Sequence, residues 1–407
     1  MKILVINTGS SSIKYQLFEM DHEQALAAGT VEKIGESVSI MTYRRRLDAG
    51  PFEKTSMEGL IVNHQEGFQH IVSFLGDPRH SVVKDKSEIT AVGHRVVHGG
   101  EAFHAPVLID DKVIASIREN IPLAPLHNPA NLTGIELAKE ILPDTPQVAV
   151  FDTAFHQTIP RRSYLYAIPF ELYEKHRVRK YGFHGTSHAY VAQCSAVYLR
   201  RPLKELNLIT IHLGNGASMA ALQNGACVDT TMGMTPLSGL VMGTRCGDVD
   251  PALPFFLAAH LGMSLKDIEG LLNKMSGLKG LCGTNDMREV IGKQAAGDER
   301  AGMALEIYAY RIKKYIGAYF AALGGLDALI FTAGIGENSP YIRELSCQGL
   351  EKMGIEIDSG GNNQEGEGIR EINTSGSQVK VLVVPTNEEL QIARETKRVI
   401  EKAKAGF

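Results

Sequence analysis

Cysteines are few and scattered in this 407-residue sequence: there are five, and no CxxC motif pairs any two of them. Such usage is typical of reduced thiols in a cytosol and argues against a disulfide framework or a zinc knuckle. No apolar run approaches the ~20 residues of a membrane helix, and the first residues lack a basic-then-apolar leader. We therefore expect a cytoplasmic protein that is neither secreted nor inserted in a membrane.

Several common functional signatures are also missing. The formal net charge of -4 gives no electrostatic reason to expect binding to nucleic acid or to an anionic membrane. Neither a GxxxxGK[ST] loop nor a GxGxxG turn after a strand occurs, which argues against a P-loop or a dinucleotide-binding Rossmann site. A GxSxG elbow is absent, so the adjacent Ser187 and His188 do not indicate a Ser-His-Asp hydrolase.

The pattern that is present alternates apolar strands with helical stretches, which predicts an α/β architecture; a chain this long is expected to form two domains. Strands are predicted at residues 2–7, 13–19, 90–97, 147–151, 207–213, 218–222, 327–332 and 379–384. Helices are predicted at residues 129–141, 186–200, 302–323 and 387–404. Segment 358–377 is polar and rich in Gly, Asn and Ser, which predicts a long surface loop.

The first two predicted strands enclose a turn of small residues, Asn7–Ser12, with Lys14 just beyond it. A hairpin tip of glycine and serine offers backbone N–H groups and hydroxyls beside a fixed cation, and these can hold a phosphate. An ordinary solvated hairpin turn is the alternative interpretation, because Gly/Ser turns are common.

The same sequence of apolar strand, glycine-containing turn and returning strand recurs at residues 207–222, and this second copy favours the phosphate-binding interpretation over the solvated turn. Aligning the two copies places Asn7 against His212 and Gly9 against Gly214. A strand and hairpin near the start of each half indicate two similar half-molecules that hold one polyphosphate between them.

A third segment, Leu326–Ser339, is predicted as a buried strand that leads into a Gly-rich turn and a polar helix start. Gly334 and Gly336 would allow the backbone to approach a flat ligand closely. The alternative is a strand-to-helix turn that simply requires a positive φ.

Two charged residues stand in or after apolar strands, where sites in α/β proteins tend to form. Arg95 lies within an apolar strand, and a buried cation needs an anion, either a ligand or an internal salt-bridge partner. Asp152 follows a buried strand and could orient a nucleophile, hold a metal-bound water or cap the next turn. His94 and His98 have a helical metal-ligand spacing, but their segment alternates like a strand, so zinc is not expected.

Two further residues lie in glycine-flanked loops. His184 stands just before a predicted helix, as a donor to developing phosphoryl charge or as an ordinary residue of a helix-start loop. Arg245 lies in the loop Met242–Pro251 and can bind carboxylate or phosphate oxygens through its planar fork. Two arginines, a histidine, a lysine-bearing hairpin and carboxylates for Mg²⁺ are the groups that phosphoryl transfer requires.

The chain resembles the acetate kinase family on long segments found in the same order along its whole length. These segments are VINTGSSSIKYQLF, GHRVVHGG, PLHNP, VAVFDTAFHQTIP, RKYGFHGTSH, HLGNGAS, DTTMGMTPLSGLVMGTRCGDVDP, FTAGIGENS and VPTNEE. The resemblance implies duplicated actin-like (ribonuclease H-like) domains with an active-site cleft between them, and a homodimer. We expect an N-terminal ATPase-like domain at residues 1–150 plus 386–407, and a C-terminal one carrying the adenosine site at residues 151–385.

The resemblance also implies an activity: reversible, Mg²⁺-dependent transfer of the γ-phosphoryl group of ATP to acetate, giving acetyl phosphate and ADP. Mn²⁺ is an alternative metal ion. A propionate or other short-chain acyl kinase is the nearest alternative. A non-catalytic, actin-like nucleotide switch is a remote one, because it would leave the two arginines and an acyl pocket without a purpose.

Residue roles follow only from the resemblance, at matching positions. The catalytic residues would be Asp152, His184, Arg245 and Arg95, and the metal ligands Asn7 and Glu388. The nucleotide and its phosphates would contact Ser10, Ser12, Lys14, His212, Leu213, Gly214, Asn215, Gly216, Asp286, Met287, Arg288, Gly334, Ile335, Gly336, Glu337 and Asn338. The acyl group would contact Arg95, Val97, Leu126, Phe183 and Pro236.

Val97 resembles the acetate-preferring members of the family, whereas propionate kinases tend to have a smaller residue there. One methylene in such a pocket is worth only ~1–3 kcal/mol, so propionate should still react, less well. Acetate is ionised at neutral pH and needs no general base, so we interpret Asp152 as an orienting and water-holding group rather than a proton acceptor.

Overall fold

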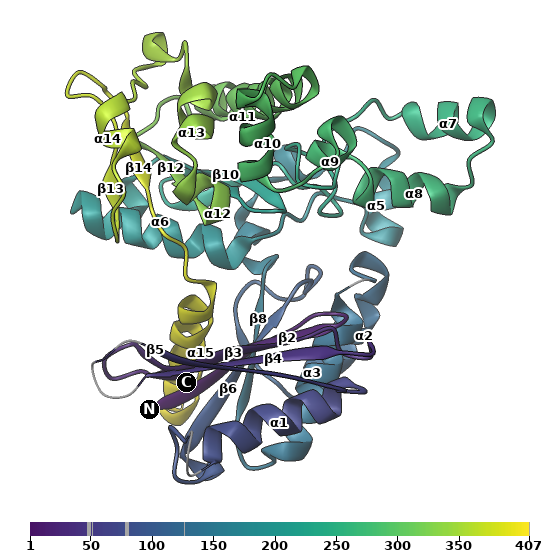
Figure 1. The fold of residues 1–407 in the computed structure, drawn as a ribbon, viewed down its shortest axis with the longest axis vertical. Coiled ribbons are helices and arrows are strands. Elements are labelled where there is room, and N and C mark those ends of the chain that lie inside the picture. Colours follow the sequence, from purple (N-terminus) through teal and green to yellow (C-terminus); the bar gives the residue numbers. More distant parts are fainter. Residues whose placement is uncertain (47–49, 51, 78–80, 126, 407) are drawn as a thin grey trace. The chain divides into compact units, whose positions relative to one another are not determined.

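The computed structural model describes residues 1–46, 50, 52–77, 81–125 and 127–406. Two compact units are formed, one by Met1–Phe155 with Asn387–Phe407 and the other by His156–Thr386. Each unit is built on one mixed β-sheet with helices packed against it (Figure 1). Among the described residues, no helix is long and apolar enough to cross a bilayer.

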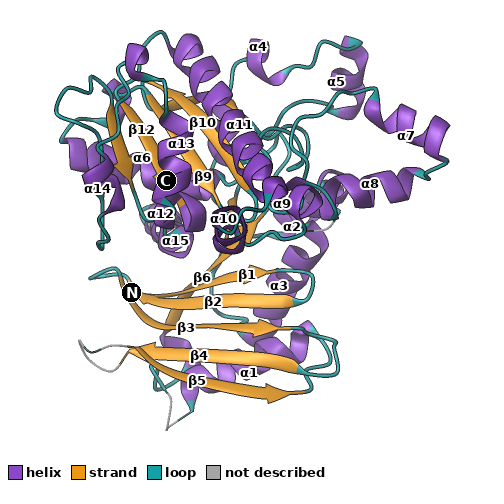
Figure 2. Cartoon of the chain, turned by 45° about the horizontal axis from the view of Figure 1, so that its top comes forward, coloured by secondary structure: helices purple, strands orange, loops and turns teal. Residues whose placement is uncertain are grey.

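The sheet of the first unit has the strand order β5-β4-β3-β2-β1-β6-β8-β7. Figure 2 labels strands β1 to β6 of this sheet. Its strands are β1 (Lys2–Thr8), β2 (Ser12–Glu19), β3 (Gln24–Glu32), β4 (Ser39–Arg46), β5 (Phe52–Gly59), β6 (Ile89–Val96), β7 (Val107–Leu108) and β8 (Gln147–Phe151). Its helices are α1 (His64–Gly76), α2 (Asp111–Glu119), α3 (Asn128–Ile141) and α15 (Glu388–Lys404).

The central strands of this sheet are buried on both faces, as their unbroken apolar runs require. Helix α3 packs against β1 and β6, and α15 packs against β1, β6 and β8. Gly93 of β6 allows α15 to approach, because a Cβ there would lie 2.4 Å from the Thr396 hydroxyl oxygen. The last helix of the chain therefore begins at the same sheet as the first strand.

The sheet of the second unit has the order β11-β10-β9-β12-β14-β13. Its strands are β9 (Leu208–Leu213), β10 (Ala217–Gln223), β11 (Ala226–Thr230), β12 (Ala328–Thr332), β13 (Arg370–Glu371) and β14 (Lys380–Val383). Its helices are α4 (Arg161–Tyr164), α5 (Phe170–His176), α6 (Gly185–Leu199), α7 (Leu253–Leu261), α8 (Leu265–Lys274), α9 (Gly277–Cys282), α10 (Met287–Ala295), α11 (Glu299–Leu323), α12 (Ala333–Asn338), α13 (Pro340–Cys347) and α14 (Ser359–Asn363). Short 3₁₀ turns lie at Lys86–Glu88, Ile121–Leu123, Ala154–Thr158, Leu203–Glu205 and Glu351–Met353.

The two sheets share one topology. The orders β3-β2-β1-β6-β8 and β11-β10-β9-β12-β14 each contain an antiparallel meander of three strands. Its first strand in the sequence, β1 or β9, pairs in parallel with the next strand of the order, which in turn pairs in parallel with the last. This is the duplicated actin-like arrangement, so the predicted fold class is confirmed. The eight predicted strands and four predicted helices are all present, with ends displaced by a few residues at most.

The prediction of a long surface loop at 358–377 is wrong. The segment contains α14 and β13, and its Asn362 is fully buried. Asn362 accepts from the Nε of the fully buried Arg343 and, through its backbone carbonyl, from Nη2, both over 2.7 Å. The same guanidinium donates to the carbonyls of Gly336 and Glu337 at the end of α12, each over 2.9 Å. The segment is polar in composition because it supplies hydrogen-bond acceptors to the buried guanidinium of Arg343, and composition alone does not distinguish this from a solvated loop.

Candidate active site

The first hairpin, β1–β2, is closed by the Gly9 N–H, which donates to the Ser12 carbonyl over 2.8 Å. Asn7 lies opposite Lys14 in the register, and the tip is exposed at Ser10. The His64 Nε2 of α1 donates to the Gly9 carbonyl over 2.8 Å, and this bond anchors the tip to α1. The predicted phosphate-binding groups therefore lie on an anchored, accessible turn.

The second hairpin, β9–β10, has the matching register. His212 lies opposite Ser218, and the Gly214 N–H donates to the Gly216 carbonyl over 3.0 Å. Asn7 and His212 therefore occupy equivalent positions, two residues before the glycine that closes each tip, as the alignment predicted. The second tip is one residue shorter than the first, which closes at Ser12.

Arg95, Asp152, Asn7 and Glu388 come together in the first unit, at the carboxyl ends of β1, β6 and β8 and the start of α15. Arg95 Nη2 donates to Asp152 Oδ2 over 2.5 Å, and Nη1 lies 3.4 Å from Asn7 Oδ1. Its Nε lies 4.0 Å from Glu388 Oε2. The internal ion pair considered as one interpretation of Arg95 is thus present, and Asp152, only 1% exposed, is its anchor.

The charges of this cluster favour a bound cation. Burial opposes the charge on Arg95, but the carboxylates of Asp152 and Glu388 outweigh it and raise the pKa of the guanidinium. Burial also raises the pKa of Glu388 to about 7, with Arg95 opposing and Asp152 adding to the rise. Asn7, Asp152 and Glu388 offer only oxygen donors, the ligand chemistry of Mg²⁺. Among the described residues no group of three or more His, Cys, Asp or Glu could hold a metal ion.

Two asparagines of α3 position these strand ends, and neither was predicted as a site residue. Asn131 accepts from the Val97 N–H over 3.0 Å and donates to the Thr8 carbonyl over 2.9 Å, so it joins the ends of β1 and β6. Asn128 accepts from the His98 N–H and donates to the His98 carbonyl, over 3.2 and 3.0 Å. Asn128 belongs to the PLHNP segment on which the family resemblance partly rests, whereas Asn131 lies two residues beyond that segment.

In the second unit, His184 precedes α6 with a φ of 56°, the left-handed conformation. Its ring stacks on that of His212 with centroids 4.3 Å apart, and its Nδ1 lies 2.9 Å from the Ser218 hydroxyl. A Cβ on Gly216 would lie 3.3 Å from His184 Nε2 and 3.4 Å from Arg245 Nη2. The hairpin tip, the histidine and the arginine therefore converge on one point.

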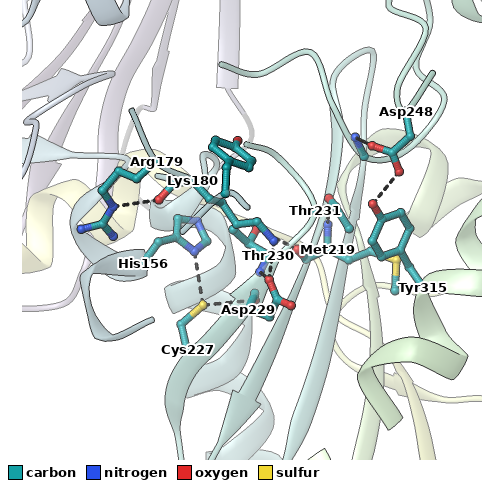
Figure 3. Close-up of polar contacts among 12 residues, drawn as sticks. His156, Arg179, Lys180, Met219, Cys227, Asp229, Thr230, Thr231, Asp248 and Tyr315 are labelled. Atoms are coloured by element: carbon teal, nitrogen blue, oxygen red, sulfur yellow. Dashed lines mark hydrogen bonds and ion pairs between the residues drawn. The ribbon is translucent and has the colours of Figure 1, made fainter. Parts of the chain in front are cut away.

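Arg245 is half-buried, and burial lowers the pKa of its guanidinium. Nη1 donates to the Pro236 carbonyl over 2.7 Å, and no ion pair of Arg245 exists within the described part of the chain. Asp248 anchors the arginine's loop: it accepts from the Gly239 N–H over 2.7 Å and from the Tyr315 hydroxyl of α11 over 2.6 Å (Figure 3). A cation held in this way is ready for an anion from outside.

His156 fixes the loop that carries His184. Its Nε2 donates to the Phe183 carbonyl over 2.9 Å, and its Nδ1 lies 3.3 Å from Cys227 Sγ (Figure 3). Gly182, with a φ of 81°, leaves the room for this ring, since a Cβ there would approach it within 2.7 Å. His156 was not predicted as a site residue, because a lone histidine after a strand carries no local sequence signal.

The predicted acyl-contact residues belong to both units. Val97 and Phe183 are buried, and Pro236 is half-buried. Val97 lies in the first unit, whereas Phe183 and Pro236 lie in the second. Leu126 is outside the described residues.

A cavity of about 670 Å³ lies in the second unit. Its lining includes eight predicted nucleotide contacts: Gly214, Asn215, Asp286, Met287, Arg288, Gly334, Ile335 and Asn338. Asn285, Ile291 and Ser339 also line it and were not predicted, whereas His212, Leu213, Gly216, Gly336 and Glu337 do not line it. The volume and the mixture of aliphatic, amide and charged groups suit a nucleoside.

Glu337 has a structural task in the same loop. Its Oε1 accepts from the Ala333 N–H over 2.8 Å and from the Thr386 N–H over 3.0 Å. The positive φ of this turn, 64°, falls on Ala333 and not on Gly334 or Gly336. The carboxylate therefore stabilises a strained turn from which α12 begins.

A duplicated actin-like fold with a nucleoside-sized cavity, and with an arginine that has no ion pair among the described residues, is typical of phosphotransferases. The model of the acetokinase family matches residues 2–394. The chain is 55% identical over 407 residues to the acetate kinase of Thermotoga petrophila, covering 99% of each, and 54% identical over 401 residues to that of Nitratidesulfovibrio vulgaris strain Hildenborough, covering 98% of this chain and all of the relative. The chain belongs to the acetokinase family.

Comparison with solved structures also places the chain in this family. The acetate kinase of Porphyromonas gingivalis superposes with a TM-score of 0.93 at 47% identity, covering 98% of this chain and 99% of that one. A propionate kinase from Francisella tularensis gives 0.91 at 43% identity, with the same coverage. Family membership makes the chain a phosphotransferase of the acetate kinase type, with propionate kinase as the alternative.

Proposed function

We propose that the chain transfers the γ-phosphoryl group of ATP to acetate, reversibly and with Mg²⁺, through the residues assembled in its two units. The observation that carries this assignment is the convergence of the Gly216 tip, His184 Nε2 and Arg245 Nη2. Three donors of this kind, around one point beside a nucleoside-sized cavity, match the equatorial oxygens of a transferring phosphoryl group.

The nucleoside would occupy the 670 Å³ cavity, with its phosphates directed toward the β9–β10 tip. His184 and Arg245 would stabilise the charge on the transferring group, and Arg95 would bind the acetate carboxylate. Acetate and the γ-phosphate repel each other, and guanidinium groups that bind them would screen that repulsion. Asp152 keeps Arg95 oriented through its 2.5 Å bond and does not need to accept a proton.

Mg²⁺, or Mn²⁺ with the same ligand chemistry, would be held by Asn7 and Glu388, directly or through water. When bound, the ion would neutralise charge on the phosphate oxygens. The raised pKa of Glu388 supports this assignment, because a half-buried carboxylate beside Asp152 is stabilised by a nearby cation. Val97 supports acetate as the preferred acid, with propionate as a poorer substrate.

The assay that tests this function traps acyl phosphate with hydroxylamine. Purified protein receives Mg-ATP with acetate, propionate or butyrate, with parallel arms that omit Mg²⁺ or replace ATP by pyrophosphate. We expect strong product with acetate, about 10- to 200-fold lower kcat/KM with propionate, and none without Mg²⁺. ATP binding without acyl phosphate from any acid would favour the nucleotide switch, and faster reaction with propionate would favour the propionate kinase.

We further propose a cytoplasmic homodimer whose interface includes α7. This helix, LPFFLAAHL, has no buried residue, and Phe255, Leu261 and the nearby Leu265 are 74%, 64% and 78% exposed. An apolar helix that is uncovered in one chain is accounted for by a second copy. The five cysteines are free, which fits a reducing compartment.

Replacing Phe255 by aspartate should convert a dimer into a monomer, because a charge would be buried in an apolar interface. Sedimentation equilibrium measures the mass. Phe170→Asp is the matched control, since Phe170 is also exposed, at 49%, but lies on α5. A monomeric wild type, or a dimeric Phe255→Asp, would refute the assignment of the interface.

A further inference from the structure

A chain of buried hydrogen bonds leads from the interior of the second unit to His184. The Thr210 hydroxyl lies 2.7 Å from His188 Nδ1, and His188 Nε2 lies 2.8 Å from the Ser218 hydroxyl. Ser218 in turn lies 2.9 Å from His184 Nδ1. Thr210, His188 and Ser218 are all 0% exposed, so water does not compete for these bonds.

The protons in this chain can be ordered, because each link needs one donor. Burial, with His156 and His212 nearby, holds the pKa of His188 well below its usual value, so its ring is neutral and carries one N–H. If Thr210 donates to Nδ1, then His188 donates from Nε2 to Ser218, and Ser218 donates to His184 Nδ1. The opposite order would direct the Thr210 hydroxyl to the Ala220 carbonyl, which is 3.5 Å away and at the limit of a hydrogen bond.

We propose that Thr210, His188 and Ser218 are positioning residues that hold His184 in its neutral Nε2–H tautomer. The inference rests on the proposed function, in which His184 Nε2 donates to the transferring phosphoryl group. The tautomer puts the only ring proton on the nitrogen that faces the Gly216 tip. In the other tautomer, Nε2 would present a lone pair to a phosphoryl oxygen.

The surroundings favour a neutral donor at this place. Arg245 Nη2 faces the same glycine, and the His212 ring stacks on that of His184. His212 is itself bonded through Nδ1 to the Ser187 hydroxyl over 2.8 Å. Among the described residues, Arg245 is a charged group that lies near the tip, and the titratable groups that pack near His184 include His212, His188 and, beside His188, His156. A second positive charge on His184 would add repulsion to a site that already holds a half-buried guanidinium.

The first test reads the tautomer directly by long-range ¹H–¹⁵N correlation of the histidine rings in the full-length protein. The signals of His184 are assigned by their absence in His184→Ala. We expect the Nε2–H pattern in the wild type and in Thr210→Ser, and a mixture of tautomers in Thr210→Val, which removes the hydroxyl at nearly constant volume. An Nδ1–H pattern in the wild type would overturn the proposal, as would a Thr210→Val spectrum identical to the wild type.

The second test is a double-mutant cycle on acyl phosphate formation. Ser218→Ala should lower kcat by about 10- to 50-fold with KM for ATP and acetate within threefold, and should cost less than threefold in a His184→Ala background. An equal loss in both backgrounds would show that Ser218 acts through packing alone and would overturn the proposal. An inactive wild type would instead refute the proposed function, while the ring spectra would still decide the tautomer.

Discussion

Replacing Arg245 by alanine is expected to lower kcat/KM for acetyl phosphate formation by about 10²–10³-fold, equivalent to about 3–4 kcal/mol of transition-state stabilisation. The guanidinium is desolvated, lies beside the Gly216 tip and has no ion pair among the described residues. Its interaction with a developing phosphoryl charge is therefore gained only when the ligand binds. Stability should change little, because the alanine variant removes a half-buried charge together with its desolvation cost.

The control for this variant is another arginine. Arg118→Ala removes a guanidinium that is 60% exposed and paired with Glu136, and it should leave kcat/KM within twofold. Arg245→Lys keeps the charge but loses the planar fork and the bond to Pro236, so it should recover only part of the activity. A fall of less than fivefold in Arg245→Ala, measured with saturating Mg-ATP, would contradict a transition-state role.

The elements that could be predicted from the sequence are those whose signal is local. The β1–β2 and β9–β10 hairpins could be predicted because an apolar run, a small-residue turn and a second alternation follow one another within about 20 residues. The equivalence of Asn7 and His212 followed from that spacing, and the strand register bears it out. The strands and helices that form the duplicated core were found for the same reason.

Contacts between distant segments could not be predicted in this way. Asn131 joins Thr8 to Val97, and Asp248 reaches Tyr315 on α11, so each role exists only after the chain has folded. The polar segment 358–377 was misread because the buried cation that it satisfies, Arg343, is held by an asparagine nineteen positions away. Polar composition predicts that Asn362 is exposed to solvent, whereas it is fully buried.

The second large effect concerns Gly277, the first residue of α9. Its φ is +62°, and a Cβ there would lie 2.1 Å from the Met242 carbonyl oxygen and 2.7 Å from that of Arg245. The N-terminus of α9 also contacts the loop that carries Arg245, because the Leu278 N–H donates to the Met242 carbonyl over 2.9 Å. Gly277→Ala should therefore destabilise the protein by about 2–5 kcal/mol, from overpacking against backbone and from the left-handed conformation.

The same substitution should also reduce activity, because relief of the clash moves the loop that carries Arg245. A displacement of about 1 Å in a catalytic group costs about 100-fold in rate, so we expect kcat to fall by that order in the fraction that remains folded. Urea unfolding gives the stability, and the hydroxylamine assay, at a temperature well below the midpoint, gives kcat.

Gly297→Ala separates the two causes of this effect. Gly297 has a φ of +90°, but a Cβ there would meet nothing within 4 Å. Its alanine variant therefore carries only the conformational cost, about 1–2 kcal/mol, and should retain full kcat. If Gly277→Ala lost no more stability than Gly297→Ala and kept its kcat, the close packing of α9 on the Met242–Arg245 turn would not be what holds the arginine in place. The left-handed strain is common to both variants. If both lost stability but only Gly277→Ala lost kcat, the loss of kcat would therefore come from the contact of α9 with the Met242–Arg245 turn, which holds the Arg245 guanidinium in place.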